Sequence, residues 1–185
     1  MLSFRPVNLA RLHARSRALL LAAACLPALA CGESAPPRGK APAPDAAAAP
    51  QATAPSHGFN DAIAWRSLDE GLAQAAQEGR PLMLVVHASW CGKCKALRPA
   101  FQRSELVELS RKFVMVNADQ DQTPAVLSYA PDGTYIPRVL FFDPQTGEVD
   151  PSLKNPRRDR HRYFYMVRDD IVGTMKRALE RHGKS

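Results

Sequence analysis

Residues 82–95 read LMLVVHASWCGKCK, an apolar run followed closely by two cysteines with two residues between them. Such a run is typical of a buried strand, and the spacing of Cys91 and Cys94 suits the first turn of a helix. There, backbone N–H groups and the helix dipole stabilise the thiolate of Cys91. The thiolate is the attacking species in thiol–disulfide exchange, and Cys94 lies within one helical turn, close enough to resolve a mixed disulfide. The stretch therefore indicates redox chemistry at a pair of thiols.

The other cysteines, Cys25 and Cys31, fall in or at the edge of an N-terminal export segment. A structural zinc site would need two more soft or imidazole ligands beside Cys91 and Cys94. The histidines outside the export segment, which show no paired ligand spacing, are His57, His87, His161 and His182. We therefore expect no metal ion and no organic cofactor, because the redox group is the cysteine pair itself.

Residues 1–30 have the pattern of a signal peptide, with an arginine-rich start and an apolar stretch at 18–26 that is too short to span a bilayer. Residues 26–32, LPALACG, resemble a bacterial lipobox, in which Cys31 becomes the lipid-modified first residue. The small residues of 28–30 also fit ordinary signal peptidase cleavage, so both forms of processing stay open. The segment predicts an exported, periplasmic protein anchored by lipid on Cys31. Glycine rather than aspartate follows the cysteine, at Gly32, and if the organism is Gram-negative this resembles the lipoproteins that are sorted to the outer membrane.

Residues 31–56 are mostly alanine and proline, a composition that cannot bury enough surface to fold. We interpret this segment as a disordered tether. Residues 57–185 are then long enough for one compact domain with a single core.

Without the four arginines of the export segment, the chain has 21 basic and 18 acidic residues, a net charge of +3. This balance does not indicate a nucleic-acid partner. The one basic cluster is residues 157–162, RRDRHR. It suits a solvated loop, or a contact with acidic lipid or a partner surface.

Hydrophobic spacing predicts alternating elements along the domain. Helices are expected at 67–78, at 91 to about 104 with a kink at Pro99, in a short turn at 105–110, and after a cap at Asp169 or Asp170. Strands are expected at 82–87, 112–117, 138–142, from 148 onward and at 163–167. The order predicts an α/β fold with a central mixed sheet covered by helices on both faces.

The domain resembles a thioredoxin fold, and within it the small single-domain relatives of protein disulfide isomerase in the secretory pathway. The resemblance rests on Trp65, the motif WCGKCKAL at 90–97, Pro99, FVMVN at 113–117, PDG at 131–133, YIPR at 135–138 and YFY at 163–165. Similar domains occur in bacterial periplasmic electron carriers.

The resemblance implies that Ile136–Pro137 is a cis peptide bond facing the two sulfurs. Such a turn exposes the backbone of Ile136 beside Cys91, where an extended substrate strand can pair with it. The alternative is an ordinary trans turn before a strand.

One position departs from the family pattern. Thioredoxins carry a buried acid six residues before the first cysteine, where it helps to move the proton of the resolving thiol, and this chain has Val85 there. Without that carboxylate, resolution by Cys94 is expected to be slower or to borrow Lys93, His87 or water.

Two further residues are candidates for tuning the site. Lys93 places a cation beside the thiolate and favours the reduced form, or it merely solubilises an exposed turn. His87 can tune the site from the strand end, or it is a packed or solvated side chain.

Trp90 is expected to shield the thiolate and contact substrate, whereas Trp65 is expected in the core. For Asp119 and Asp121 a strand-end turn is preferred to a cation site, because too few further oxygen ligands lie nearby.

The sequence thus predicts an exported thiol–disulfide oxidoreductase of protein substrates, in which Cys91 attacks, Cys94 resolves and Pro137 orients the substrate. Oxidase, isomerase and reductase activity all stay open, as does a membrane protein as electron donor or acceptor. Two other classes are a Cu(I)-handling module that uses the same thiolates and a tethered binding module without turnover.

Overall fold

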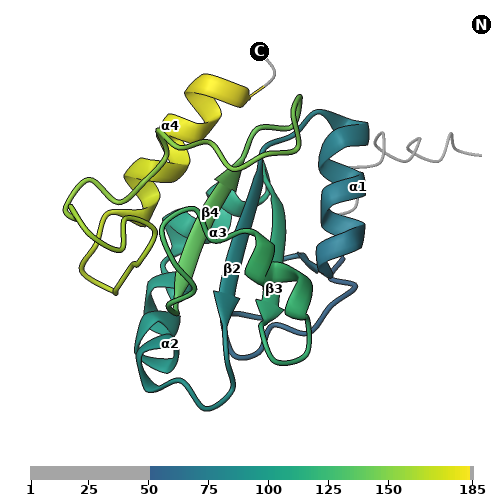
Figure 1. The fold of residues 1–185 in the computed structure, drawn as a ribbon. Helices are drawn as coiled ribbons and strands as arrows, with labels where there is room; N and C mark the ends of the chain where they lie inside the picture. The colour runs from purple at the N-terminus through teal and green to yellow at the C-terminus, as the bar shows by residue number, and fades with distance from the viewer. Residues whose placement is uncertain (1–50, 184–185) are drawn as a thin grey trace, which may run out of the picture. The chain divides into compact units, whose positions relative to one another are not determined.

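The computed structural model describes residues 51–183 (Figure 1). The predicted signal peptide, the lipidation site Cys31 and the tether up to residue 50 lie outside the described residues. Residues 51–56, which we assigned to the tether, are hydrogen-bonded to the domain: the backbone N–H groups of Thr53 and Ala54 donate to the carbonyl of Trp65 at 2.9 and 3.2 Å. The folded unit therefore begins before the predicted boundary at residue 57.

A four-stranded mixed sheet forms the centre of the domain, with strand order β1-β3-β2-β4. Its strands are β1 (Trp65–Arg66), β2 (Leu82–His87), β3 (Val114–Asp119) and β4 (Arg138–Phe142). β1 and β2 each pair with β3 in parallel, and β4 pairs with β2 antiparallel. The central strand β2 has the predicted bounds, and all of its residues are buried. The mixed sheet predicted from the sequence is confirmed.

Helices cover both faces of this sheet (Figure 1). They are α1 (Leu68–Glu78), α2 (Gly92–Leu97), the 3-10 helix η1 (Arg98–Gln102), α3 (Ser104–Ser110), the 3-10 helix η2 (Pro124–Ser128) and α4 (Ile171–His182). Because side chains alternate along a strand, Met83 and Val85 pack with α2, η1, α3 and α4, whereas Leu84 and Val86 pack with α1 and η2. Burial on both faces explains why β2 is a continuous apolar run.

The helix α1 ends at residue 78 as predicted, and α4 begins after one of its two predicted caps. Ser67 precedes α1, and the Glu70 carboxylate accepts a hydrogen bond from its hydroxyl at 2.9 Å. Gly79 ends α1 in the left-handed conformation with φ of 60°. Of the two predicted caps of α4, the structure uses Asp170, whose carboxylate accepts from the N–H of Gly173 at 2.8 Å.

The predicted helix from 91 to about 104 is wrong in its extent. The α-helical segment α2 ends at Leu97 and continues as η1, which contains Pro99. Proline has no N–H to donate to the carbonyl four residues earlier, so the helix tightens into a 3-10 turn there. The strand predicted at 112–117 begins two residues later, because the N–H groups of Lys112 and Phe113 bond to Leu109 and Ser110 at the end of α3.

Two predicted strands are not formed. Val149 makes only an isolated bridge with Phe142, and residues 163–167 are not a strand. Tyr163 and Tyr165 are 1% and 0% exposed, so their alternation reflects burial in a loop that contacts the sheet. Among the backbone groups of residues 163–167, the carbonyl of Tyr163 is the one hydrogen-bonded to a strand, and it accepts the N–H of Val139 at 2.8 Å. The short strand β1, in contrast, was not predicted, although its Trp65 is buried as expected.

We expect Gly71→Ala to lower the free energy of unfolding by about 1–3 kcal/mol, because an added Cβ would collide with Cγ2 of Val116 on β3. Urea denaturation monitored by circular dichroism measures the change. Gly92→Ala is the matched control, since an added Cβ there meets open space. Adding Val116→Ala to Gly71→Ala should recover part of the lost stability, because it removes the methyl group that the new Cβ would strike. If the two single alanine variants are equally stable, or if the double variant recovers nothing, the close packing of α1 on β3 does not explain the loss.

Candidate active site

The two cysteines lie where β2 has ended and α2 begins. Cys91 caps α2 and forms a disulfide with Cys94, with their Cα atoms 5.3 Å apart. The N–H of Cys94 points at Sγ of Cys91 at 3.1 Å. A hydrogen bond to the charged form of a thiol favours that form, so this N–H stabilises a Cys91 thiolate when the disulfide is reduced.

The two sulfurs differ in their access to solvent. Cys91 is 6% exposed and Cys94 is 1% exposed. A macromolecular partner therefore meets Cys91 first. This order suits Cys91 as the attacking and Cys94 as the resolving thiol.

Ile136 closes the other side of the sulfur pair. The peptide bond between Ile136 and Pro137 is cis, as the resemblance implied. The side chain of Ile136 packs against the cluster formed by Ala88, Cys91 and Cys94. The structure thus brings together two segments that are more than forty residues apart in sequence.

A buried arginine holds the loop that carries Ile136. Arg138 is 0% exposed, and its guanidinium donates to the carbonyl of Tyr135 at 2.7 Å and of Val126 at 3.4 Å. The Tyr135 hydroxyl donates to the Asp132 carboxylate and accepts the N–H of Tyr163 at 3.0 Å. Burial, with Asp132, raises the pKa of Tyr135 well above its usual value, so the hydroxyl stays protonated and keeps this bond.

Sequence reasoning missed the role of this arginine. The available signal was an arginine at the head of the apolar run RVLFF, because a cation at the start of a buried strand needs acceptors close by.

Trp90 lies next to Cys91 and is 66% exposed. Its indole N–H donates to the carboxylate of Asp121 at 2.7 Å, so the ring is fixed although it faces solvent. Asp119 in turn accepts the N–H of Asp121 at 3.0 Å, which gives the predicted strand-end turn. Within residues 51–183, no group of three or more metal-ligating side chains is present. The sequence did not reveal that Asp121 orients Trp90.

His87 is packed in the core rather than placed among the sulfurs. It is 1% exposed, and its ring contacts Phe59 and His57 with ring centroids 5.3 and 4.9 Å apart. Burial, and to a lesser extent the nearby His57, lowers the pKa of His87 to about 4, because both disfavour a positive charge on the ring. The Asp119 carboxylate, 4.0 Å away, acts in the opposite direction but does not offset burial. His87 is therefore neutral at pH 7.

The remaining candidates have simple surroundings. Val85 is 0% exposed and lies in the apolar core at the position where thioredoxins carry an acid. Lys93 is exposed on α2, and no carboxylate of residues 51–183 lies within ion-pair distance of it. The structure therefore supplies no internal base at residue 85 beside the sulfurs.

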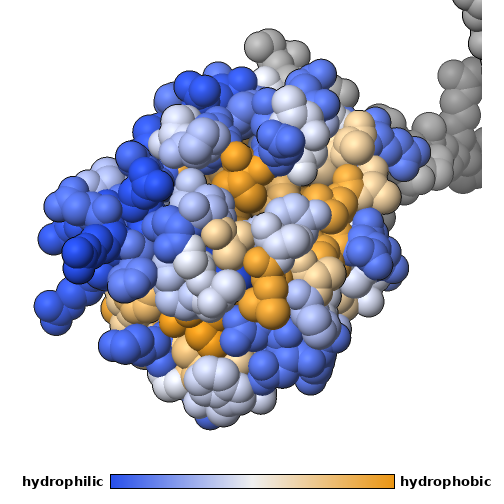
Figure 2. Space-filling view, in the orientation of Figure 1, coloured by the Kyte–Doolittle hydropathy of each residue, from blue (hydrophilic) through white to orange (hydrophobic). Residues whose placement is uncertain are grey.

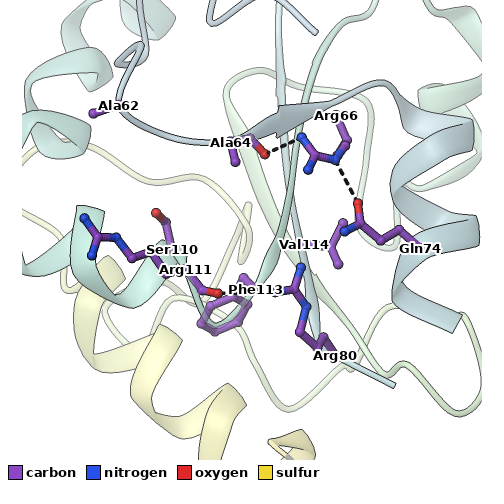
Figure 3. Close-up of a pocket in the computed structure, with 9 residues that line it drawn as sticks. All are labelled: Ala62, Ala64, Arg66, Gln74, Arg80, Ser110, Arg111, Phe113 and Val114. Atoms are coloured by element: carbon purple, nitrogen blue, oxygen red, sulfur yellow. Dashed lines mark hydrogen bonds between the residues drawn. The ribbon is translucent and has the colours of Figure 1, made fainter. Parts of the chain in front are cut away.

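A small cavity of about 60 Å³ lies elsewhere in the domain (Figure 3). Its lining includes Arg66 on β1, Arg80 before β2, and Phe113 and Val114 at the start of β3. Because β1, β2 and β3 run parallel, the starts of β2 and β3 lie at the edge opposite the cysteine pair. The Arg66 side chain already donates to Gln74 at 2.8 Å and to Ala64 at 3.3 Å, as drawn. This cavity is separate from the candidate active site.

Comparison with known proteins gives consistent matches. Residues 64–144 match the model of a family described as thioredoxin-like. Anterior gradient protein 3 of Mus musculus is 35% identical over 130 residues, which cover 67% of this chain and 76% of that protein. The human anterior gradient protein 2 homolog is 32% identical over 130 residues, covering 68% of this chain and 71% of that protein.

Among solved structures, the solution structure of a thioredoxin from Thermus thermophilus superposes with a TM-score of 0.51. It is 17% identical and covers 66% of this chain and 91% of that chain, which supports the fold alone. In the part of the chain that the structure describes, no helix is long and apolar enough to cross a membrane.

We expect the stability of the protein to fall with pH below about 6.5 partly through His87. Between that pH and the native pKa of about 4, the unfolded chain binds a proton at His87 that the native state does not. This costs the native state at most about 1.4 kcal/mol for each pH unit, and the loss ends below the native pKa. The contribution is fully present above pH 6.5.

The measurement is urea denaturation at several pH values for the wild type and for His87→Phe. The variant should show the shallower dependence between pH 6.5 and 4, whatever its stability at pH 7. His161→Gln is the control, because His161 is exposed. Identical slopes for the wild type and His87→Phe would contradict the assignment.

Proposed function

The chain belongs to the thioredoxin-like family, and we propose that it is an exported thiol–disulfide oxidoreductase acting on proteins through Cys91 and Cys94. The observation that carries the proposal is the disulfide at the start of α2, with one wall formed by Ile136. The similarity to anterior gradient proteins across most of the domain supports the class of activity.

The reaction follows from the order of access to the sulfurs. In the reduced protein, the Cys91 thiolate attacks one sulfur of a substrate disulfide, and the other substrate sulfur leaves as a thiolate. Cys94 then attacks Sγ of Cys91, which re-forms the internal disulfide and releases the second substrate thiolate. Two electrons pass to the substrate, and its two thiolates take up two protons. The reverse sequence oxidises a substrate dithiol.

Two groups around the pair are suited to hold a polypeptide. Ile136 lies beside the sulfurs, and an extended substrate can pair with its backbone as a short added strand. Trp90 offers an exposed aromatic surface next to Cys91 and is fixed by Asp121. Pro137 orients this arrangement by setting the course of the chain after Ile136.

The charges near the pair bear on the direction of electron flow. Val85 leaves the interior without a carboxylate that would raise the thiol pKa, and Lys93 adds a cation on the outer side. Both features favour the reduced form and make the disulfide the better oxidant. They support oxidation or isomerisation of substrates, with a membrane protein as the electron acceptor or donor.

Trapping tests this proposal against the two other classes. Cys94→Ser should accumulate mixed disulfides with substrate proteins through Cys91, because the resolving thiol is gone. Non-reducing gels and mass spectrometry detect these adducts, and Cys91→Ala/Cys94→Ser is the matched control. The reduced wild type should also reduce a disulfide-bonded protein such as insulin or reshuffle a scrambled one. Its reduction potential, measured by titration, then assigns the direction.

Clients that remain bound to Cys91→Ala without adduct formation would instead indicate a binding module. Stoichiometric Cu(I) that is lost in Cys94→Ser, without any exchange activity, would indicate metal handling.

Lipid attachment is tested separately on the full chain expressed in a Gram-negative bacterium. We expect the wild type in the membrane fraction and Cys31→Ser in the soluble periplasmic fraction, because acyl chains supply the anchor. Cys25→Ser should behave as the wild type. Mass spectrometry of the mature N-terminus identifies the modification, and an unmodified Cys31 would remove the anchor.

A further inference from the structure

A strongly basic segment lies between β4 and α4. Residues 154–168, here called the basic loop, contain one acidic residue, Asp159, and six cationic ones. These are Lys154, Arg157, Arg158, Arg160, Arg162 and Arg168. Figure 2 shows a strongly hydrophilic surface on the left, where Figure 1 places the loops beside α4.

The basic loop has a defined conformation that leaves Arg157, Arg160 and Arg168 exposed, whereas Arg158 and Arg162 are half-buried. Asn155 is 0% exposed, and its amide donates to the carbonyl of Phe164 at 2.8 Å. Its backbone N–H donates to Arg162 at 2.8 Å, and its side-chain oxygen accepts the N–H of Arg157 at 3.0 Å. One buried asparagine thus joins the two ends of the arginine-rich stretch.

Only part of this charge is neutralised by the protein itself. Arg158 pairs with Asp169 at 3.2 Å and Arg162 with Asp132 at 3.8 Å. Within residues 51–183, no carboxylate lies within ion-pair distance of Arg157 or Arg160, and both are exposed. Six cations are opposed by three carboxylates, namely Asp159 within the loop and the paired Asp169 and Asp132, so the net charge is +3. Like charges held close together favour an anionic partner.

The basic loop is joined to the loop that faces the sulfurs. The ring of His161 lies 4.5 Å from that of Tyr135, and the N–H of Arg162 donates to Asp132 at 2.6 Å. Tyr135 directly precedes Ile136, which packs against the cysteine pair. A polypeptide that reacts at Cys91 and pairs with Ile136 therefore has the basic loop beside it.

We propose that the basic loop binds an acidic segment of the polypeptide substrate, close in sequence to the cysteine that reacts with Cys91. This inference rests on the proposed function and adds a preference among substrates. One surface hollow combines Arg157, Arg158 and Arg168 with a single acid, Asp169, which already pairs with Arg158, so it offers a place for an acidic side chain. A second hollow places Arg160 and Arg162 beside Asp132 and Asp159 and is less suited to an anion. An acidic substrate is recognised by charge complementarity, which raises the rate of encounter more than it strengthens the final complex.

The test uses three peptides of equal length, each with one cysteine in the same chromogenic mixed disulfide. Four positions beside the cysteine are Glu, Gln or Lys. The reduced full-length protein should react with the Glu peptide about tenfold faster than with the Gln peptide at low salt, and slowest with the Lys peptide. The preference should largely vanish at about 1 M salt, where charges are screened within about 3 Å.

Arg157→Gln/Arg160→Gln should lower the ratio of the Glu to the Gln rate constant by threefold or more and leave the Gln rate constant unchanged. Arg111→Gln/Lys112→Gln is the matched control, since it removes the same charge before β3, at the opposite edge of the sheet. It should preserve the ratio. An equal fall in both double variants would assign the effect to net charge and overturn the proposal.

Equal rate constants for all three peptides in the wild type would also overturn it, while leaving the proposed function intact. No reaction with any peptide would remove the proposed function itself. Equal peptide rates together with binding to phosphatidylglycerol–phosphatidylcholine vesicles that Arg157→Gln/Arg160→Gln abolishes would assign the basic loop to a lipid surface instead.

Discussion

The central strand β2 is the constraint on which the site depends. All six of its residues are buried, and it is paired with β3 on one side and β4 on the other. Its position in the sheet is therefore fixed by two ladders of hydrogen bonds and by apolar packing on both faces. The chain leaves this strand at His87 and reaches Cys91 after three residues, so the position of the reactive sulfur is set by a strand that is paired on both sides and buried on both faces. β4 begins directly after Pro137, and its pairing with β2 brings Ile136 to the same sulfurs.

How much of this could be predicted depended on whether the physical cause was local. The run at 82–87 gave the bounds of β2 because an uninterrupted apolar stretch between Pro81 and the small residues at 88–89 admits one strand and little else. The end of α1 at Gly79 was equally predictable, because a left-handed residue and a following proline stop a helix locally. The fold class followed from such elements and from the resemblance carried by the motifs.

The errors arose where a distant contact decides the outcome. Tyr163 and Tyr165 alternate with less buried residues as in a strand, yet the backbone there turns back to bond with Asp132 and Tyr135 and forms no ladder. Propensity describes a half-buried extended surface and does not say which backbone groups find partners. The same limit hid the bond between Trp90 and Asp121, since thirty-one residues separate them. Only the fold determines such pairs.

Arg138 connects these features, because a buried cation imposes order on the backbone around it. Burial lowers the pKa of Arg138, but a guanidinium remains charged, so acceptors inside the protein stabilise it. Its two terminal nitrogens find such acceptors, whereas its buried Nε has no hydrogen-bond partner among residues 51–183. The guanidinium takes the carbonyls of Tyr135 and Val126, which fixes the course of the chain just before Ile136. Tyr135 connects this segment to the basic loop: its hydroxyl is hydrogen-bonded to Asp132 and Tyr163, and its ring contacts His161. The backbone edge beside the sulfurs and the charged surface beyond it are thus held by one network that begins at the buried Arg138. A substrate that contacts both surfaces meets a preorganised site and loses little further free energy in ordering the protein.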